Sequence, residues 1–457
     1  MLHLNKLRQL ARFFVLSWLC LHFSVSSADS AQELFADLKQ AIYQVRVIDI
    51  GSGDKYTIGS GFQVTASGQV ATNYHVVSSY IHKPEKFRIE LVDSDEQIIE
   101  AQLLNFDVIH DLALLQIADQ RPLVMALYPK QDKQGSLLDK GDRIFSIGNP
   151  HDLGMTIIEG TYNGLLKNSR YQKILFSGSL NSGMSGGPAI NTDGKVIGIN
   201  VSKQGEEISF LVPVKFLHTL MANTEAMIEH GTIQSESAEA EHDQYIEWIG
   251  ESLLQDQDEY YQPILAKEFE LEPLGELRVP ADLSESLKCW GRTVDKKDND
   301  KLKHRATNKT CQTSDSIYVQ DRFYVGNLSY RFEWLTTDEL NSIQFYRFIQ
   351  NRFSHGSPRT GYDGEDLTSY QCKTQFIKTA GHGWKASTCF RAYKDYPGMY
   401  DMTMVMTSVD ESNKAAVMNL NAGGISKNNA LQLLKKMINA VEWAEPAEGA
   451  NAQGGEE

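Results

Sequence analysis

Hydrophobic and polar residues alternate in short runs through most of the first half of the chain. The alternation at Val45–Ile48, Ile58–Val64, Val70–Thr72 and Phe87–Val92 has the period of half-buried β-strands. Further runs of this kind occupy residues 102–106, 113–117, 143–147, 173–177, 195–201 and 208–212. Gly, Asn and Asp separate the runs. Many short strands with frequent turns predict an all-β barrel or sandwich.

Helical periodicity frames this β-rich region. Apolar residues recur at helical spacing in Ala31–Gln44 before it and in Val214–His230 after it. The next segment, 232–243 (TIQSESAEAEHD), is polar, acidic and almost free of large apolar residues, which is typical of a linker. We therefore expect one domain at residues 29–231, followed by a linker at 232–243.

The second half of the chain has a mixed pattern. Tyr245–Glu268 is amphipathic with a helical period and contains Pro263, which predicts a long helix with a kink. Strand-like and helical runs alternate beyond it, with helical runs in 335–353 and 427–443. We expect a separate α+β domain at 244–444. Residues 445–457 form an acidic Gly/Ala/Gln segment, for which we expect disorder.

The N-terminus has the pattern of a secretory signal peptide. Lys6, Arg8 and Arg12 precede an apolar stretch, Phe13–Phe23, and small residues follow at 26–28. This order predicts cleavage after residue 28 and export to the periplasm or an extracellular space. The alternative is an uncleaved anchor, but the apolar stretch is shorter than the about 20 residues of a spanning helix. After cleavage we expect no stable membrane insertion.

The charge balance argues against a nucleic-acid partner. The chain has 44 Lys+Arg and 59 Asp+Glu, a net charge of −15. The predicted signal peptide, 1–28, carries three positive charges and no negative ones, so its removal leaves a net charge of −18. A surface of this sign repels phosphate backbones and anionic lipid.

Cysteine usage is consistent with export. After removal of Cys20 with the signal peptide, four cysteines remain, all in the C-terminal half: Cys289, Cys311, Cys372 and Cys389. An even number in an exported chain predicts two disulfides, with three possible pairings. Cys289–Cys311 and Cys372–Cys389 are favoured because each closes a short loop. No pair has the close spacing of zinc ligands and no HExxH-like run occurs, so we expect no metal site.

The segment 181–190 (NSGMSGGPAI) has the composition of a nucleophile loop. Glycines on both sides of Ser185 allow a tight turn that directs backbone N–H groups into one cavity. Acyl transfer requires such donors beside a nucleophilic hydroxyl, and here they would be the N–H groups of Gly183 and Ser185. The alternative is an ordinary Gly-rich turn between strands.

A serine hydroxyl needs a base and an orienting carboxylate. His75 lies in the run ATNYHVV, and Asp111 is a lone acid at the start of the apolar run DLALLQI. A carboxylate there can be partly buried, accept the second N–H of the imidazole and stabilise the imidazolium. Taken singly, each residue can also be explained without catalysis. His75 would then be a surface histidine, and Asp111 an aspartate that caps a strand.

Together these runs resemble one family. ATNYHVV, HDLALLQI and SGMSGGPAI resemble the histidine, aspartate and serine motifs of trypsin-like serine proteases of the HtrA/Deg type, in the same order. Flanking segments that also resemble the family lie at 59–62, 147–150, 194–200 and 208–214. The resemblance covers about residues 40–220. It implies a chymotrypsin-like double β-barrel and a serine endopeptidase that cleaves proteins or peptides through an acyl-enzyme.

No cofactor is expected, since neither a phosphate loop nor a dinucleotide fingerprint occurs.

Two departures from the family pattern limit what the resemblance implies. Met184 stands where the HtrA type usually has Asn and trypsins have Asp. Methionine cannot form the ion pair that activates trypsin-type zymogens, so we expect no activation by a new N-terminus. Residues 232–457 show no PDZ pattern, which puts HtrA-like regulation in doubt.

Substrate preference is expected from the same resemblance. The pocket for the residue before the scissile bond would be lined by the stretch ahead of Ser185 and by Ile199, Asn200 and Val201. Ser179 stands where trypsins have an acid, so we expect cleavage after small or medium apolar residues rather than after Arg or Lys.

Two further hypotheses belong to other classes of function. The first is a binding or chaperone protein that keeps the protease fold without significant proteolysis. The second assigns binding of protein or glycan to the aromatic-rich segment 287–443, whose plain alternative is an ordinary aromatic core.

Overall fold

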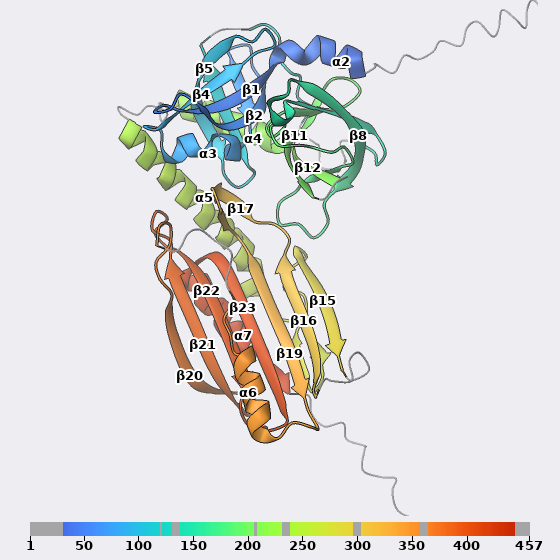
Figure 1. Ribbon diagram of the computed structural model, residues 1–457, viewed down its shortest axis with the longest axis vertical. Helices are drawn as coiled ribbons and strands as arrows, with labels where there is room; N and C mark the ends of the chain where they lie inside the picture. Colours follow the sequence, from blue (N-terminus) through green and yellow to red (C-terminus); the bar gives the residue numbers. More distant parts are fainter. Residues whose placement is uncertain are drawn as a thin grey trace, which may run out of the picture.

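The computed structural model describes residues 31–118, 121–129, 138–204, 208–230, 238–295, 303–356 and 364–443. The predicted signal peptide, half of the predicted linker and the predicted tail lie outside the described residues. Figure 1 shows two parts, with the barrels at one end of the molecule and a large sheet at the other.

The first part begins with a closed six-stranded antiparallel barrel. Its strands follow the order β1-β2-β3-β6-β5-β4 around the barrel. They are β1 (Ile42–Asp49), β2 (Lys55–Gln63), β3 (Gln69–Thr72), β4 (Phe87–Val92), β5 (Ile98–Asp107) and β6 (Leu112–Ile117). Buried aliphatic side chains such as Val45, Val47, Val70 and Leu115 fill its interior. The alternation of apolar and polar positions places these side chains inside.

A second closed barrel follows, with the order β10-β11-β12-β9-β8-β7. Its strands are β7 (Arg143–Gly148), β8 (Thr156–Leu165), β9 (Ile174–Phe176), β10 (Pro188–Ile190), β11 (Val196–Gln204) and β12 (Ile208–Pro213). Two packed six-stranded barrels confirm the expected double-barrel architecture.

The helices of this part differ in two respects from expectation. The first helix, α2 (Ala31–Leu38), gives way to a 3₁₀ turn, η2 (Lys39–Ala41), and to β1 from Ile42, because Ile42 and Tyr43 are buried among the barrel strands. The last helix, α4 (Val214–Glu229), begins and ends close to the predicted segment. Between β3 and β4 lies α3 (Tyr74–His82), a helix that the periodicity did not predict.

The C-terminal part is α+β, as expected. Its centre is a seven-stranded antiparallel sheet of order β15-β16-β19-β23-β22-β21-β20. These strands are β15 (Leu287–Val294), β16 (Arg305–Thr313), β19 (Leu328–Thr336), β20 (Gln371–Thr379), β21 (His382–Ala392), β22 (Met399–Ser408) and β23 (Lys414–Ser426). A smaller sheet consists of β13 (Leu271–Leu274), β14 (Leu277–Pro280) and β24 (Glu442–Trp443). Another is the hairpin of β17 (Ile317–Gln320) and β18 (Phe323–Val325).

Helices pack against both faces of the large sheet. On one face, α5 (Ala238–Ala266) and α7 (Lys427–Asn439) share a core with Met404 and Met406 of β22. On the other face, α6 (Ser342–Arg352) packs against Val405. Val405 lies between Met404 and Met406 on β22, so its side chain points to the opposite face of the sheet. In Figure 1, α5 runs from the barrels along the sheet and so joins the two parts.

Both favoured disulfides are present. Cys289–Cys311 joins the paired strands β15 and β16, and Cys372–Cys389 joins β20 and β21. In each case the two cysteines are directly opposite in the strand register.

The two parts share one hydrophobic core. Barrel residues such as Tyr74 and Val77 belong to the same buried cluster as Ile249 of α5, Val319 of the β17–β18 hairpin and Tyr396. Polar contacts accompany it, including a hydrogen bond between His82 Nε2 and the Tyr396 hydroxyl at 3.1 Å. In the described part of the chain, no helix combines the length and apolarity of a membrane span.

Candidate active site

His75 lies in the first turn of α3, directly after β3. The Asn73 amide anchors the start of this helix by donating to the Asp111 carbonyl oxygen at 2.7 Å. Backbone N–H groups in the first turn of a helix lack partners within the helix. The N–H of His75 is such a group, and it donates to Asp111 Oδ1 at 2.9 Å. Asp111 therefore holds both the helix and the imidazole.

Asp111 follows a tight turn between β5 and β6. Asp107 Oδ1 accepts the backbone N–H groups of Ile109 and His110, each at 3.0 Å, which fixes the turn. At Asp111 the backbone adopts a φ of 58°, and β6 begins at Leu112. The turn thus presents the Asp111 carboxylate to the neighbouring end of β3.

The second carboxylate oxygen of Asp111 meets the imidazole. His75 Nδ1 lies 2.7 Å from Asp111 Oδ2. A carboxylate only accepts, so Nδ1 carries the hydrogen and Nε2 is left with its lone pair, as a general base requires. Burial has the largest influence on the pKa of His75 and lowers it. Coulombic attraction to Asp111 and the hydrogen bond that His75 donates to it together outweigh burial, so the pKa of His75 is raised above 6.5.

Ser185 lies in the loop between β9 and β10, and glycines shape this loop. Gly183 and Gly186 have φ values of 94° and 85°, in the left-handed region that side chains disfavour. Gly186 packs against Thr72 and Asn73, which leave no space for a side chain. This packing brings the loop of Ser185 directly onto the start of the His75 helix.

Two backbone donors beside Ser185 are unused. Within the described residues, the N–H groups of Gly183 and Ser185 donate no hydrogen bond, whereas those of Met184, Gly186 and Gly187 bond to backbone carbonyl oxygens. Buried N–H groups are normally paired. Two neighbouring free donors next to a serine hydroxyl can therefore bind an oxygen of a ligand.

Ser60 on β2 ties the nucleophile loop to the first barrel, a role that the sequence alone did not suggest. Its N–H donates to the Ser185 carbonyl oxygen at 2.7 Å, and its hydroxyl donates to the Gly183 carbonyl oxygen at 2.8 Å. The Ser60 hydroxyl also accepts the N–H of Asn149 at 3.0 Å. The first two bonds fix the carbonyl groups of Ser185 and Gly183, and the third fixes the Ser60 hydroxyl that makes one of them.

Among the described residues, the Ser185 hydroxyl makes no hydrogen bond to His75. It donates instead to the Val201 carbonyl oxygen at 3.2 Å. Rotation about the Cα–Cβ bond of Ser185 moves the hydroxyl between staggered positions. Hydrogen bonds between catalytic groups are often long or misaligned without substrate and tighten when substrate binds.

The three residues expected to contact substrate differ in position. Val201 is partly exposed and lines a cavity beside His75. Ile199 and Asn200 are fully buried. The Asn200 side chain accepts the Ser146 hydroxyl at 2.8 Å and donates to the Ile147 and Met184 carbonyl oxygens, so it supports the nucleophile loop from behind. Met184, the departure from the family pattern, is buried in the second barrel.

One residue of the C-terminal part also reaches the site. The Tyr318 ring lies edge-on to the His75 ring, with 6.0 Å between ring centres. Its hydroxyl lies 3.2 Å from the Ser78 hydroxyl on α3. Burial, foremost, raises the pKa of Tyr318 to about 12, so it stays neutral. No local sequence pattern identifies Tyr318, because only the tertiary fold brings it to α3.

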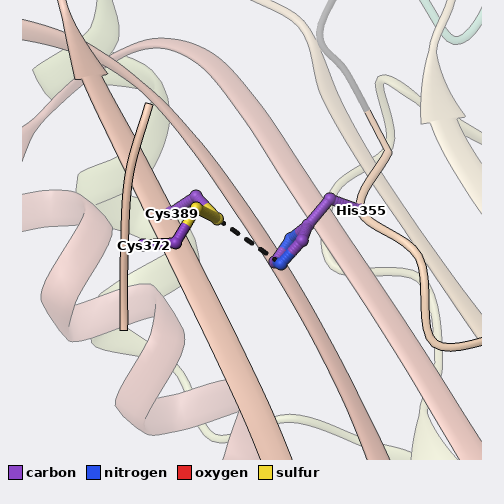
Figure 2. Close-up of side chains that lie close together, drawn as sticks. All are labelled: His355, Cys372 and Cys389. Carbon is purple, nitrogen blue, oxygen red and sulfur yellow. Dashed lines mark hydrogen bonds between the residues drawn. A yellow bond between two sulfur atoms is a disulfide. The ribbon is translucent and has the colours of Figure 1, made fainter. Parts of the chain in front are cut away.

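A cluster of residue types that can bind metals lies away from this site. Figure 2 shows His355 directed at the Cys372–Cys389 disulfide, with Nε2 3.4 Å from Cys389 Sγ. The three possible ligand atoms lie within 4.8 Å of one another. Metals bind cysteine as the thiolate, and here both sulfurs are committed to a disulfide. His355 Nε2 instead lies 3.0 Å from the Ser387 hydroxyl.

Comparison with known proteins agrees with this geometry. Residues 59–199, which include His75, Asp111 and Ser185, match the trypsin-like peptidase domain. "Serine protease HTRA1" of Xenopus laevis is 32% identical over 174 residues, 36% of this chain and 36% of that protein. "Serine protease HTRA2, mitochondrial" of Drosophila virilis is 29% identical over 201 residues, 42% of this chain and 46% of that protein.

A solved structure, the serine endoprotease from Yersinia pestis, is 27% identical with a TM-score of 0.37, over 43% of this chain and 66% of that one. The chain spans less than half the length of the curated relatives named above. Fold, motifs and family match agree on the class that residues 59–199 resemble, the trypsin-like peptidase domain. Within that class, the relatives named above, with which the domain shares 32% and 29% of its residues, are HTRA serine proteases.

Proposed function

We propose that this chain is a serine endopeptidase with His75, Asp111 and Ser185 as its catalytic triad. The observation that carries the proposal is the pair of hydrogen bonds that His75 donates to Asp111. This pair lies close to the loop of Ser185, in which the N–H groups of Gly183 and Ser185 are unused. This combination supplies a base, its orienting carboxylate and an oxyanion hole in one place.

In the reaction, His75 Nε2 takes the hydroxyl proton as Ser185 Oγ bonds to the substrate carbonyl carbon. The carbonyl oxygen becomes an oxyanion, which accepts the N–H groups of Gly183 and Ser185. His75 then gives the proton to the leaving amine, the C–N bond breaks and an acyl-enzyme ester remains. A water molecule, deprotonated by His75, cleaves the ester and restores the Ser185 hydroxyl.

Three further features belong to the proposal. Substrates are proteins or peptides cleaved after small or medium apolar residues, since Ser179 offers no carboxylate to a basic side chain. The protein is exported to the periplasm or outside the cell, on the pattern of residues 1–28. Ile199, Asn200 and Val201 form or support the substrate pocket.

The direct test is covalent labelling with a fluorophosphonate probe, followed by mass spectrometry of the peptides. We expect a single labelled residue, Ser185, in the folded protein and no labelling after heat denaturation. A folded protein that the probe does not label would contradict the proposal. It would favour the alternative, a binding protein with a protease fold. The hydrogen bond from the Ser185 hydroxyl to the Val201 carbonyl oxygen is consistent with that alternative.

The pH dependence of kcat/KM should show the Asp111–His75 interaction. His75 must be neutral to act as a base, and its pKa is raised above 6.5. The protonated, inactive form therefore persists to higher pH than in an isolated histidine. We expect kcat/KM to rise with pH through an apparent pKa above 6.5. A rise completed below pH 6 would contradict the assigned base.

Gly183→Ala should impair the oxyanion hole. Gly183 has a φ of 94°, and an added Cβ would clash with the Asn149 carbonyl oxygen. The loop must shift and misdirect a donor, so we expect kcat to fall about 10²-fold or more. Gly53→Ala is the matched control, because Gly53 also has a positive φ, 76°, with no atom within 4 Å of an added Cβ. If both variants kept full kcat, the assignment of the Gly183 N–H would be wrong.

A further inference from the structure

The β17–β18 hairpin of the C-terminal part lies against the catalytic helix. In Figure 1, β17 projects from the region of the large sheet toward the barrels, beside α3. The buried Tyr74 hydroxyl donates to the Val319 carbonyl oxygen at 2.8 Å, and the Tyr318 hydroxyl meets that of Ser78 at 3.2 Å. Tyr74 and Ser78 stand on either side of His75 in the sequence, so the hairpin contacts α3 around the catalytic histidine.

The hairpin is also held by the second barrel. Asp315, just ahead of β17, accepts the Ser169 hydroxyl and the N–H of Arg170. Lys173 Nζ lies 3.3 Å from the Asp315 carboxylate. Val319, Phe323 and other hairpin residues are buried in the core that the two parts share. Contacts with both barrels therefore fix the hairpin relative to His75.

A cavity of about 320 Å³ lies between the hairpin and the catalytic residues. His75, Asp111 and Val201 line it from the protease domain, and Ile317, Tyr318 and Tyr324 line it from the hairpin. The Tyr318 and Tyr324 rings pack edge to face, with 5.5 Å between their centres. Val201 is one of the residues that we expect beside the substrate segment ahead of the scissile bond.

The walls of this cavity are mainly apolar or aromatic. Val108, Ile109, Tyr171 and Val212 also line it, and Gln172 and Ser316 add uncharged polar groups. The three basic side chains at the cavity already have acidic partners: His75 has Asp111, His110 has Asp107 and Lys173 has Asp315. An apolar side chain can therefore enter without leaving a charge unpaired, whereas a charged side chain would lose water without gaining a partner.

We propose that this cavity is a substrate subsite built jointly by the two parts of the chain. Tyr318 and Tyr324 form its outer wall and select an apolar side chain of the substrate, ahead of the scissile bond. The proposal rests on the proposed peptidase function and adds a role for the C-terminal part. Tyr318 is thus a specificity-determining residue at a site that the peptidase domain alone does not complete.

The test compares cleavage of a peptide library by the full chain and by three tyrosine variants. Tyr318→Ala removes the wall, Tyr318→Phe keeps the ring but loses the contact with Ser78, and Tyr346→Ala removes an exposed tyrosine of α6 as a control. The preference is the ratio of kcat/KM for peptides with and without a large apolar side chain at one substrate position. We expect this ratio to fall about tenfold in Tyr318→Ala. Tyr318→Phe and Tyr346→Ala should keep the preference.

Other outcomes overturn the subsite. An unchanged profile in Tyr318→Ala would show that the cavity does not contact substrate. A uniform rise in cleavage of all peptides would show that the hairpin is a cover that restricts access, not a selective wall. A uniform fall would show that Tyr318 only supports α3.

Labelling of Ser185 in each variant separates this proposal from the proposed function. If the unaltered chain is labelled and cleaves peptides but Tyr318→Ala keeps its profile, only the subsite is wrong. If the unaltered chain is neither labelled nor active, the peptidase function fails and the subsite fails with it. Melting temperatures of the variants identify a Tyr318→Ala protein that is merely unfolded, and Tyr324→Ala then repeats the test at the more exposed ring.

Discussion

Ser185→Ala is expected to lower kcat/KM by about 10⁴-fold or more, because alanine cannot form the acyl-enzyme. The substitution removes one hydroxyl, whose hydrogen bond in this structure is to the Val201 carbonyl oxygen. The backbone N–H groups at positions 183 and 185 remain. The variant should therefore fold and still bind substrate. The measurement is hydrolysis of a peptide substrate, with thermal unfolding to show that the fold is intact.

A serine remote from the site provides the control for this prediction. Ser342 is exposed in the first turn of α6, and Ser342→Ala should keep the activity of the unaltered chain. Retention of more than about one per cent of the activity in Ser185→Ala would mean that another nucleophile, or a contaminating protease, performs the cleavage.

Asp111→Asn should lower kcat by about 10⁴-fold with little effect on the fold. Asparagine can still accept the His75 N–H through its carbonyl oxygen, so the start of α3 keeps its cap. Its amide group then faces Nδ1, where a donor meets a donor. The imidazole must place its hydrogen on Nε2, and the base is lost. Circular dichroism and kcat, measured together, test this expectation.

The chain contains a matched control for this variant. Asp107 and His110 form a second pair, also with 2.7 Å between Nδ1 and Oδ2. Asp107 accepts two backbone N–H groups through Oδ1, which the asparagine oxygen can also do. We expect Asp107→Asn to change kcat by less than about tenfold. If Asp107→Asn had the larger effect, the assignment of the orienting carboxylate would be wrong.

The sequence predicted the parts of the fold that depend on short-range patterns. Alternating runs located most barrel strands, since a half-buried strand must alternate. The glycines around Ser185 predicted a tight loop, and the structure has positive φ values at Gly183 and Gly186. The cystine pairs also followed from local spacing, because each joins neighbouring strands.

The helix that carries His75 could not be predicted from its residues. Tyr74–His82 contains Val76, Val77 and Ile81, which favour strands. Tertiary contacts override this preference: Tyr74, Val76, Val77 and Ile81 are all buried, and Asp111 caps the first turn. A local pattern cannot report a cap that lies 36 residues further along the chain.

The position of Tyr318 at the site also depends on tertiary contacts, as the α3 helix does. The contact of Tyr318 with Ser78 joins residues 240 positions apart, and the Tyr74–Val319 bond spans 245. Only the packing of α5 and the hairpin against the first barrel creates these contacts. The roles of Ser60 and Asn200 are likewise long-range hydrogen bonds, although both residues lie in segments that the family resemblance had marked.

The shared core has a consequence for how the molecule can be divided. Tyr74 and Val77 on α3 are shielded by Val319, Phe323 and Tyr396, which lie far along the chain. If the chain were cut between α4 and α5 and the halves separated, these apolar surfaces would meet water, which costs free energy in proportion to their area. We therefore expect the catalytic helix to unfold together with the β17–β18 hairpin and α5, which pack against it.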